Sequence, residues 1–161
     1  EVDIIMCTFS KSLASLGGYI ATSEVVANYV KHNSRPFIFS ASITPASCAT
    51  ALKALEILRT EPDRVKRLQE NGDYMRRKFK EAGIPIGNSQ TAIIPVYTYD
   101  TMRTFKIHNM LLKEGVYTNP VIPPAVPEGE CLLRTSYTAT HTKEQLDEAF
   151  EIIKRVFDTI K

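Results

Sequence analysis

The sequence predicts an α/β fold. Short runs rich in β-branched and aromatic residues alternate along the chain with longer segments whose apolar residues recur at helical spacing. The 161 residues suffice for one domain, or for one domain and a small second lobe, and the 43% hydrophobic and 24% charged content is typical of a globular protein. No internal repeat interrupts this alternation.

The first elements surround a small-residue loop. An apolar run at residues 4–6 predicts a buried strand, and the loop after it ends at Gly17 and Gly18. Residues 18–22 are expected to form a second short strand. Ser23 is a suitable N-cap for a helix that reaches about Lys31.

The middle of the chain is expected to be mainly helical. A short extended stretch is predicted at residues 37–42, because it is rich in β-forming residues. Pro45 suits the first turn of a helix that ends near Thr60. Pro62 begins a second helix, and Gly83 is its expected C-terminal cap.

The second half repeats the alternation of strands and helices. Its expected elements are a strand at 92–99, a helix at 102–114, a proline-rich connection at 117–127, a strand at 131–139 and a final helix. Pro95 places the first of these strands at an edge or a bulge. Thr142 and Gln145 have the spacing of a capping box at the start of the final helix.

Charge, hydropathy and cysteine usage exclude several functional classes. The net charge of +2 is too small to indicate a nucleic-acid or membrane-surface partner, and no apolar run approaches the roughly 20 residues of a membrane span. Cys7, Cys48 and Cys131 are odd in number and far apart, as expected for reduced thiols in a cytoplasmic protein. His32 and His108 have no carboxylate or cysteine neighbours at ligand spacing, so no metal site is expected, and His141 is expected to be a satisfied loop or cap histidine.

Lys11 is the first candidate for chemistry. It stands where the apolar strand changes into a loop rich in serine and glycine. One interpretation is an amine held in a pocket, where desolvation lowers the lysine pKa and leaves a nucleophile that forms a Schiff base with an aldehyde. The other is a lysine that merely ends a strand. The local sequence leaves both open.

A resemblance favours the first interpretation. The segment from Thr8 to Ser12, followed by Gly17 and Gly18, resembles the pyridoxal phosphate lysine segment of the α-oxoamine synthases, which are fold-type I enzymes. The resemblance implies that Lys11 is the Schiff-base lysine and later the base at the substrate α-carbon. It also implies that Thr8 binds the cofactor phosphate. Cys7 departs from the family pattern, which usually has glycine there.

Two further segments match the same family in the same order. Residues 37–45 resemble a segment that crosses the dimer interface, which implies that Ser40 and Ser42 hold the phosphate of the partner subunit's cofactor. Residues 132–142 resemble the segment whose arginine, here Arg134, binds the carboxylate of the amino acid substrate. An arginine between apolar strand residues is costly to bury unless it is paired, which favours such a role.

The resemblance implies a fold and an activity. We expect the C-terminal part of a fold-type I pyridoxal phosphate transferase, with the end of the large domain at residues 1–83 and a small α/β domain at 84–161. The expected enzyme condenses an amino acid with an acyl-CoA, with decarboxylation, to an α-oxoamine, and works as a homodimer with shared active sites. The motifs are most like those of the serine palmitoyltransferase type, and the 8-amino-7-oxononanoate synthase type is also considered.

The start of the chain leads to a further expectation. It enters a strand at once, without a start methionine, as expected for a piece of a larger protein. In the family, the acid opposite the pyridine nitrogen and the group stacked on the ring precede the lysine strand. The chain by itself is therefore expected to be inactive. Two alternatives stay open: a non-catalytic lobe for dimer contacts, and another fold-type I enzyme such as an aminotransferase.

Overall fold

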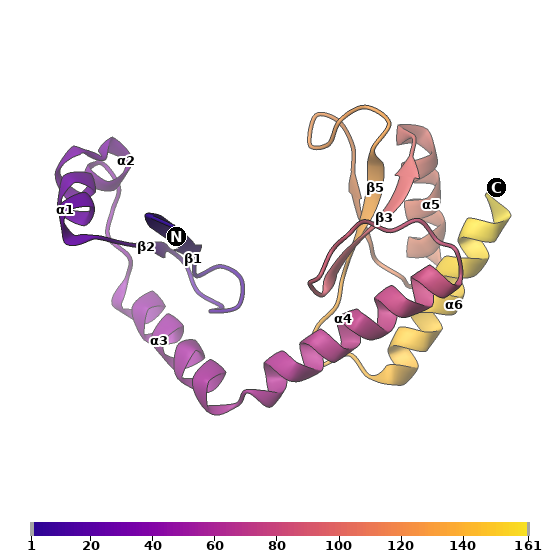
Figure 1. Ribbon diagram of the computed structural model, residues 1–161, viewed down its shortest axis with the longest axis horizontal. Coiled ribbons are helices and arrows are strands. Elements are labelled where there is room, and N and C mark those ends of the chain that lie inside the picture. The colour runs from indigo at the N-terminus through magenta and orange to yellow at the C-terminus, as the bar shows by residue number, and fades with distance from the viewer. Residues whose placement is uncertain (1, 161) are drawn as a thin grey trace. The chain divides into compact units, whose positions relative to one another are not determined.

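The computed structural model describes residues 2–160 and divides into two compact units (Figure 1). The first unit is Glu1–Pro62 and the second is Asp63–Lys161. In the described part of the chain, no helix is both long and apolar enough to cross a bilayer.

The first unit begins with an antiparallel hairpin. Strands β1 (Ile4–Thr8) and β2 (Gly18–Thr22) pair so that Cys7 lies opposite Tyr19. Both strands were predicted, but the prediction that the first is buried is wrong for this chain. Its side chains stay exposed, with Met6 at 74%, because the elements of this unit leave the hairpin uncovered.

Three helices complete the first unit: α1 (Glu24–Asn33), α2 (Arg35–Ile38) and α3 (Pro45–Thr60). The extended stretch predicted at 37–42 is wrong at its start, because Pro36 lies in the first turn of α2, a position that favours helix. The prediction for α3 is confirmed. Thr44 caps this helix, since the Ser47 N–H donates to its hydroxyl at 3.2 Å.

The second unit contains a three-stranded antiparallel sheet in the order β3-β5-β4. The strands are β3 (Ile93–Tyr99), β4 (Asn119–Val121) and β5 (Cys131–Ser136). The sequence predicted β3 and β5, and β3 is an edge strand, as Pro95 requires. The short strand β4 lies inside the proline-rich segment, where the sequence predicted only a connection.

Helices α4 (Asp63–Glu81), α5 (Thr101–Lys113) and α6 (Lys143–Thr159) pack with this sheet (Figure 1). The predicted capping box is present at the start of α6, where Thr142 and Gln145 exchange hydrogen bonds. The core includes alternate residues of the strands and one stripe of each helix: Met75, Phe79, Ile94, Val96, Ile107, Leu111, Leu133, Phe150, Ile153 and Val156. One face of the sheet is therefore covered by helices.

The boundary between the units lies at a helix start. Contacts divide the chain between Pro62 and Asp63, because α4 packs against α6 and β3 of the second unit. The division expected after residue 83 concerns the domains of a larger protein, and it stays a prediction.

Candidate functional site

Lys11 lies in the loop that joins β1 to β2. The loop is closed by backbone hydrogen bonds from Phe9 N–H to the Gly17 carbonyl at 2.9 Å and from Ser15 N–H to the Phe9 carbonyl at 2.9 Å. Lys11 is exposed, and within the described residues its amine has no hydrogen bond or ion pair. Among the described residues, the Lys11 amine is therefore exposed and is not held in a pocket.

Two hydroxyls lie together beside Lys11. The Thr8 and Ser10 hydroxyl oxygens are 2.9 Å apart, and the Ser10 N–H donates to the Thr8 hydroxyl at 3.3 Å. The Thr8 hydroxyl also donates to the Gly17 carbonyl at 3.3 Å. The end of β1 thus presents a primary amine, two hydroxyls and backbone N–H groups in one exposed loop, a donor set that suits an aldehyde and a phosphate.

Gly17 and Gly18 are required by the path of the loop. Gly17 has a φ of +106°, and a Cβ built on it would lie 2.8 Å from the Ile43 Cδ1 atom. A Cβ on Gly18 would lie 2.5 Å from the Cys7 carbonyl oxygen. A side chain at either position would force the hairpin or its neighbour to move.

The start of α3, which follows the segment of Ser40 and Ser42, lies next to this loop. The Ser15 hydroxyl donates to the Ser47 carbonyl at 2.7 Å, which ties the lysine loop to the first turn of α3. Ser40 and Ser42 are exposed and make no hydrogen bond with the described residues. The structure brings Thr8 and Lys11 into one loop, whereas their relation to Ser40 and Ser42 stays a prediction.

Arg134 lies in the middle of β5, in the second unit. Leu133 and Thr135 are buried against the helices, so Arg134 points to the opposite, open face and is exposed. Within the described residues it has no ion pair or hydrogen bond. Because side chains of a strand alternate between its two faces, the Arg134 guanidinium is not buried although Leu133 and Thr135 are. The guanidinium is therefore free to bind an anion.

The open face of the sheet also carries aromatic rings. Tyr97 and Tyr99 of β3 point away from the helices, and their rings stack with centroids 5.6 Å apart. Neither tyrosine was among the predicted site residues. The alternation along β3 could have indicated that they share the open face, because the residues between them and before them, Ile94, Val96 and Thr98, face the buried core.

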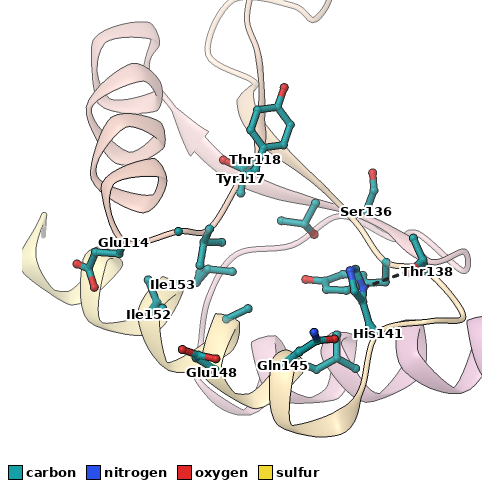
Figure 2. Close-up of a pocket in the computed structure, with 16 residues that line it drawn as sticks. Glu114, Tyr117, Thr118, Ser136, Thr138, His141, Gln145, Glu148, Ile152 and Ile153 are labelled. Atoms are coloured by element: carbon teal, nitrogen blue, oxygen red, sulfur yellow. Dashed lines mark hydrogen bonds between the residues drawn. The ribbon is translucent and has the colours of Figure 1, made fainter.

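A cavity of about 580 Å³ opens in the second unit, between the end of α5, the end of β5 and α6 (Figure 2). Its lining is partly apolar, with Val116, Leu146, Ala149, Ile152 and Ile153, and partly polar. His141 is held at its rim, where its Nδ1 accepts the Thr138 N–H at 3.2 Å (Figure 2). The imidazole thus has a hydrogen-bond partner within its own loop.

Tyr137 lines the same cavity and was missed by sequence reasoning. Its hydroxyl oxygen is buried and has no hydrogen-bond partner among the described residues. Burial raises the pKa of Tyr137 to about 12, against a smaller lowering by the nearby Thr135 hydroxyl. The phenol thus stays neutral well above physiological pH.

Comparison with known proteins gives consistent matches. Serine palmitoyltransferase (SPT) of Bacteroides thetaiotaomicron is 49% identical over 160 residues, which are 99% of this chain and 41% of the relative. The 8-amino-7-oxononanoate synthase of Petrotoga mobilis is 40% identical over 156 residues, 97% of this chain and 40% of the relative. These are the two enzyme types that the sequence motifs resemble, so the predicted resemblance is confirmed.

The solved structure of SPT with its PLP internal aldimine matches with a TM-score of 0.91 and 30% identity, over 99% of this chain and 40% of that one. The predicted fold, part of a fold-type I transferase, is thereby confirmed. The chain spans about 40% of the length of the curated relatives it matches. The family model for aminotransferase class I and II matches residues 1–153. The chain therefore belongs to the aminotransferase class I and II family.

Proposed function

We propose that this chain is part of a pyridoxal phosphate-dependent acyltransferase that condenses an amino acid with an acyl-CoA, with loss of carbon dioxide. The observation that carries the proposal is one exposed segment, at the end of β1 and in the loop after it, that carries Lys11 together with the hydrogen-bonded Thr8 and Ser10 hydroxyls. The names of the relatives support the acyltransferase class, because serine palmitoyltransferase is named for an acyl transfer involving serine and 8-amino-7-oxononanoate synthase for an amino ketone product.

The residues of the loop fit this cofactor. An exposed primary amine can hold the aldehyde carbon, and the paired hydroxyls with the adjacent backbone N–H groups can hold a phosphate. When bound, pyridoxal phosphate supplies an electron sink for negative charge at the substrate α-carbon. The similar structure of SPT contains this cofactor, which supports the same assignment here.

The chain's own residues then have distinct tasks. Lys11 holds the cofactor and moves the proton at the amino acid α-carbon, while Thr8 binds the phosphate. Arg134 binds the substrate carboxylate with its planar guanidinium and so fixes the orientation of the amino acid. In the proposed homodimer, Ser40 and Ser42 donate to the phosphate of the partner subunit's cofactor.

The homodimer is supported by apolar side chains that the first unit leaves exposed. Val25, Phe37, Phe39 and Leu52 are each more than half exposed, at 81%, 63%, 80% and 69%. Exposed apolar residues in such number indicate a protein interface. A cytoplasmic location is proposed from the unpaired thiols Cys7, Cys48 and Cys131.

The test uses the full-length protein that contains this chain. We expect a visible absorption band of the bound cofactor that borohydride removes, and we expect Lys11→Ala to abolish it while Lys31→Ala, an exposed lysine of α1, retains it. A colourless full-length protein in the presence of pyridoxal phosphate would overturn the proposal.

The reaction class is tested by substrate pairs. Glycine, alanine and serine are each combined with short and long acyl-CoAs, and release of free CoA is measured. We expect CoA release that requires the amino acid. Amino-group transfer to a keto acid without CoA release would instead indicate an aminotransferase. The isolated 161-residue chain is expected to release no CoA in the same assay.

A further inference from the structure

Arg134 has two lateral neighbours on the open face of the sheet. The register places Arg134 opposite Pro95 of β3 on one side and opposite Asn119 of β4 on the other. Directly opposite residues of antiparallel strands lie on the same face, with Cβ atoms about 4.5–5.5 Å apart. Asn119 is therefore the lateral neighbour of Arg134 on the face that the helices leave open.

The two neighbours differ in chemistry. The Pro95 ring has no hydrogen-bonding group, whereas the Asn119 carboxamide has two N–H donors and a carbonyl acceptor. Asn119 is half-buried, and within the described residues its side chain makes no hydrogen bond. Two neighbouring positions of the sheet thus carry an amide donor and a guanidinium, neither of which is hydrogen-bonded to the described residues.

The surroundings leave few other partners for a bound carboxylate. Further along β5 the open face carries Leu132, which is flanked in register by Tyr97 and Val121. In the other direction lies Ser136, two residues away along the strand and therefore about 7 Å from Arg134. Ser136 also lies at the cavity (Figure 2). Asn119 is the closest neighbouring donor by register.

A carboxylate has more acceptor positions than one arginine uses. Its two oxygens offer about four lone-pair sites, and a bidentate arginine occupies two of them. A second donor from the side fixes rotation of the carboxylate about the axis of the guanidinium.

We propose that Asn119 is a second carboxylate-binding residue, whose carboxamide N–H donates to the substrate carboxylate held by Arg134. This inference rests on the proposed function, because the carboxylate is that of the amino acid substrate. It extends that function by assigning a side chain of β4, the strand inside the proline-rich segment, to recognition of the amino acid.

The experiment compares variants of the full-length enzyme by steady-state kinetics and by calorimetric titration with the amino acid. Asn119→Ala is expected to raise the amino acid KM and Kd about tenfold, the loss of one hydrogen bond to a charged group, and to leave the acyl-CoA KM unchanged. Asn119→Asp is expected to pair with Arg134 and to repel the substrate, so that amino acid affinity falls about a hundredfold or more.

Two matched controls share the sheet face. Val121→Ala alters an apolar residue of the same strand, and Ser136→Ala removes the more distant hydroxyl. Both are expected to retain the parent's amino acid KM within about twofold. The nearly isosteric Asn119→Asp variant, with its circular dichroism spectrum and Tm, shows that a loss of affinity is not a loss of folding.

The failures of the two proposals are distinguishable. If the enzyme releases CoA and Asn119→Ala binds the amino acid as the parent does, the role of Asn119 is wrong while the proposed function stands. If the full-length enzyme shows neither cofactor absorption nor CoA release, both are overturned. Equal losses in Asn119→Ala and Val121→Ala would also refute the assignment, because they would indicate a disturbed strand.

Discussion

Replacing Tyr137 by phenylalanine should stabilise the second unit. The hydroxyl of Tyr137 is buried without a partner among the described residues. Removing it abolishes the desolvation cost of an unpaired polar group, which is about 1–3 kcal/mol, and leaves the ring's packing unchanged. We expect Tyr137→Phe to raise the free energy of unfolding of the 161-residue chain by about 1 kcal/mol at pH 7.

The same substitution should change the pH dependence of stability. Burial raises the pKa of Tyr137 from 10.0 to about 12, so the folded state keeps a proton that the unfolded state loses. The contribution of the protonated Tyr137 to the free energy of unfolding is therefore fully present below pH 10 and is lost as the pH rises toward 12. A shift of about two units corresponds to about 3 kcal/mol over this window, and the phenylalanine variant should lack this loss.

The assay is urea unfolding followed by far-UV circular dichroism at pH 7, 9, 10 and 11, since the chain has no tryptophan. Tyr117→Phe is the matched control, because Tyr117 lines the same cavity but is 74% exposed, and its loss should change little. The reasoning is refuted if Tyr137→Phe destabilises the chain at pH 7 and its stability falls in parallel with the parent above pH 10.

Three further predictions concern other contacts. The hydrogen bond from Lys78 lowers the pKa of Asp147 in the folded chain. The pair should therefore stabilise the chain above the carboxyl pKa of the unfolded state, and this stabilisation should be lost as the pH falls through the folded-state pKa. Acid titrations of the parent and of Asp147→Asn, followed by circular dichroism, should differ in this pH range. Phe79→Ala should cost about 3–5 kcal/mol in urea unfolding, because Phe79 is fully buried. Gly18→Ala should weaken cofactor absorption of the full-length enzyme, since its Cβ meets the Cys7 carbonyl; unchanged absorption would contradict this.

Strong periodic patterns made most of the fold predictable. Helix α6 combines a capping box with a long apolar stripe, and β3 and β5 alternate clearly, so their positions followed from local sequence. Strand β4 was missed because it has three residues, one of which is proline, and forms only by pairing with β5. Helix α2 was missed because β-forming residues follow Pro36, which begins a short turn of helix.

The candidate site was less predictable for a different reason. The position of Lys11 in a loop after a strand follows from local sequence, but its exposure depends on what packs over the loop. The proximity of Asn119 to Arg134 depends on strand register, which pairs residues 15 apart through a segment with no periodic pattern. The unpaired hydroxyl of Tyr137 likewise depends on its packing environment, which no local motif describes.

The hydrogen bond from Ser15 to the Ser47 carbonyl has a consequence for motion at Lys11. Together with the hydrogen bond from the Phe9 N–H to the Gly17 carbonyl, it holds both sides of the loop, so the backbone around Lys11 is fixed. The flexible four-carbon stem of the lysine can then reposition its amine without any change in the hairpin. A shorter amine in the same loop would therefore reach less far from the hairpin.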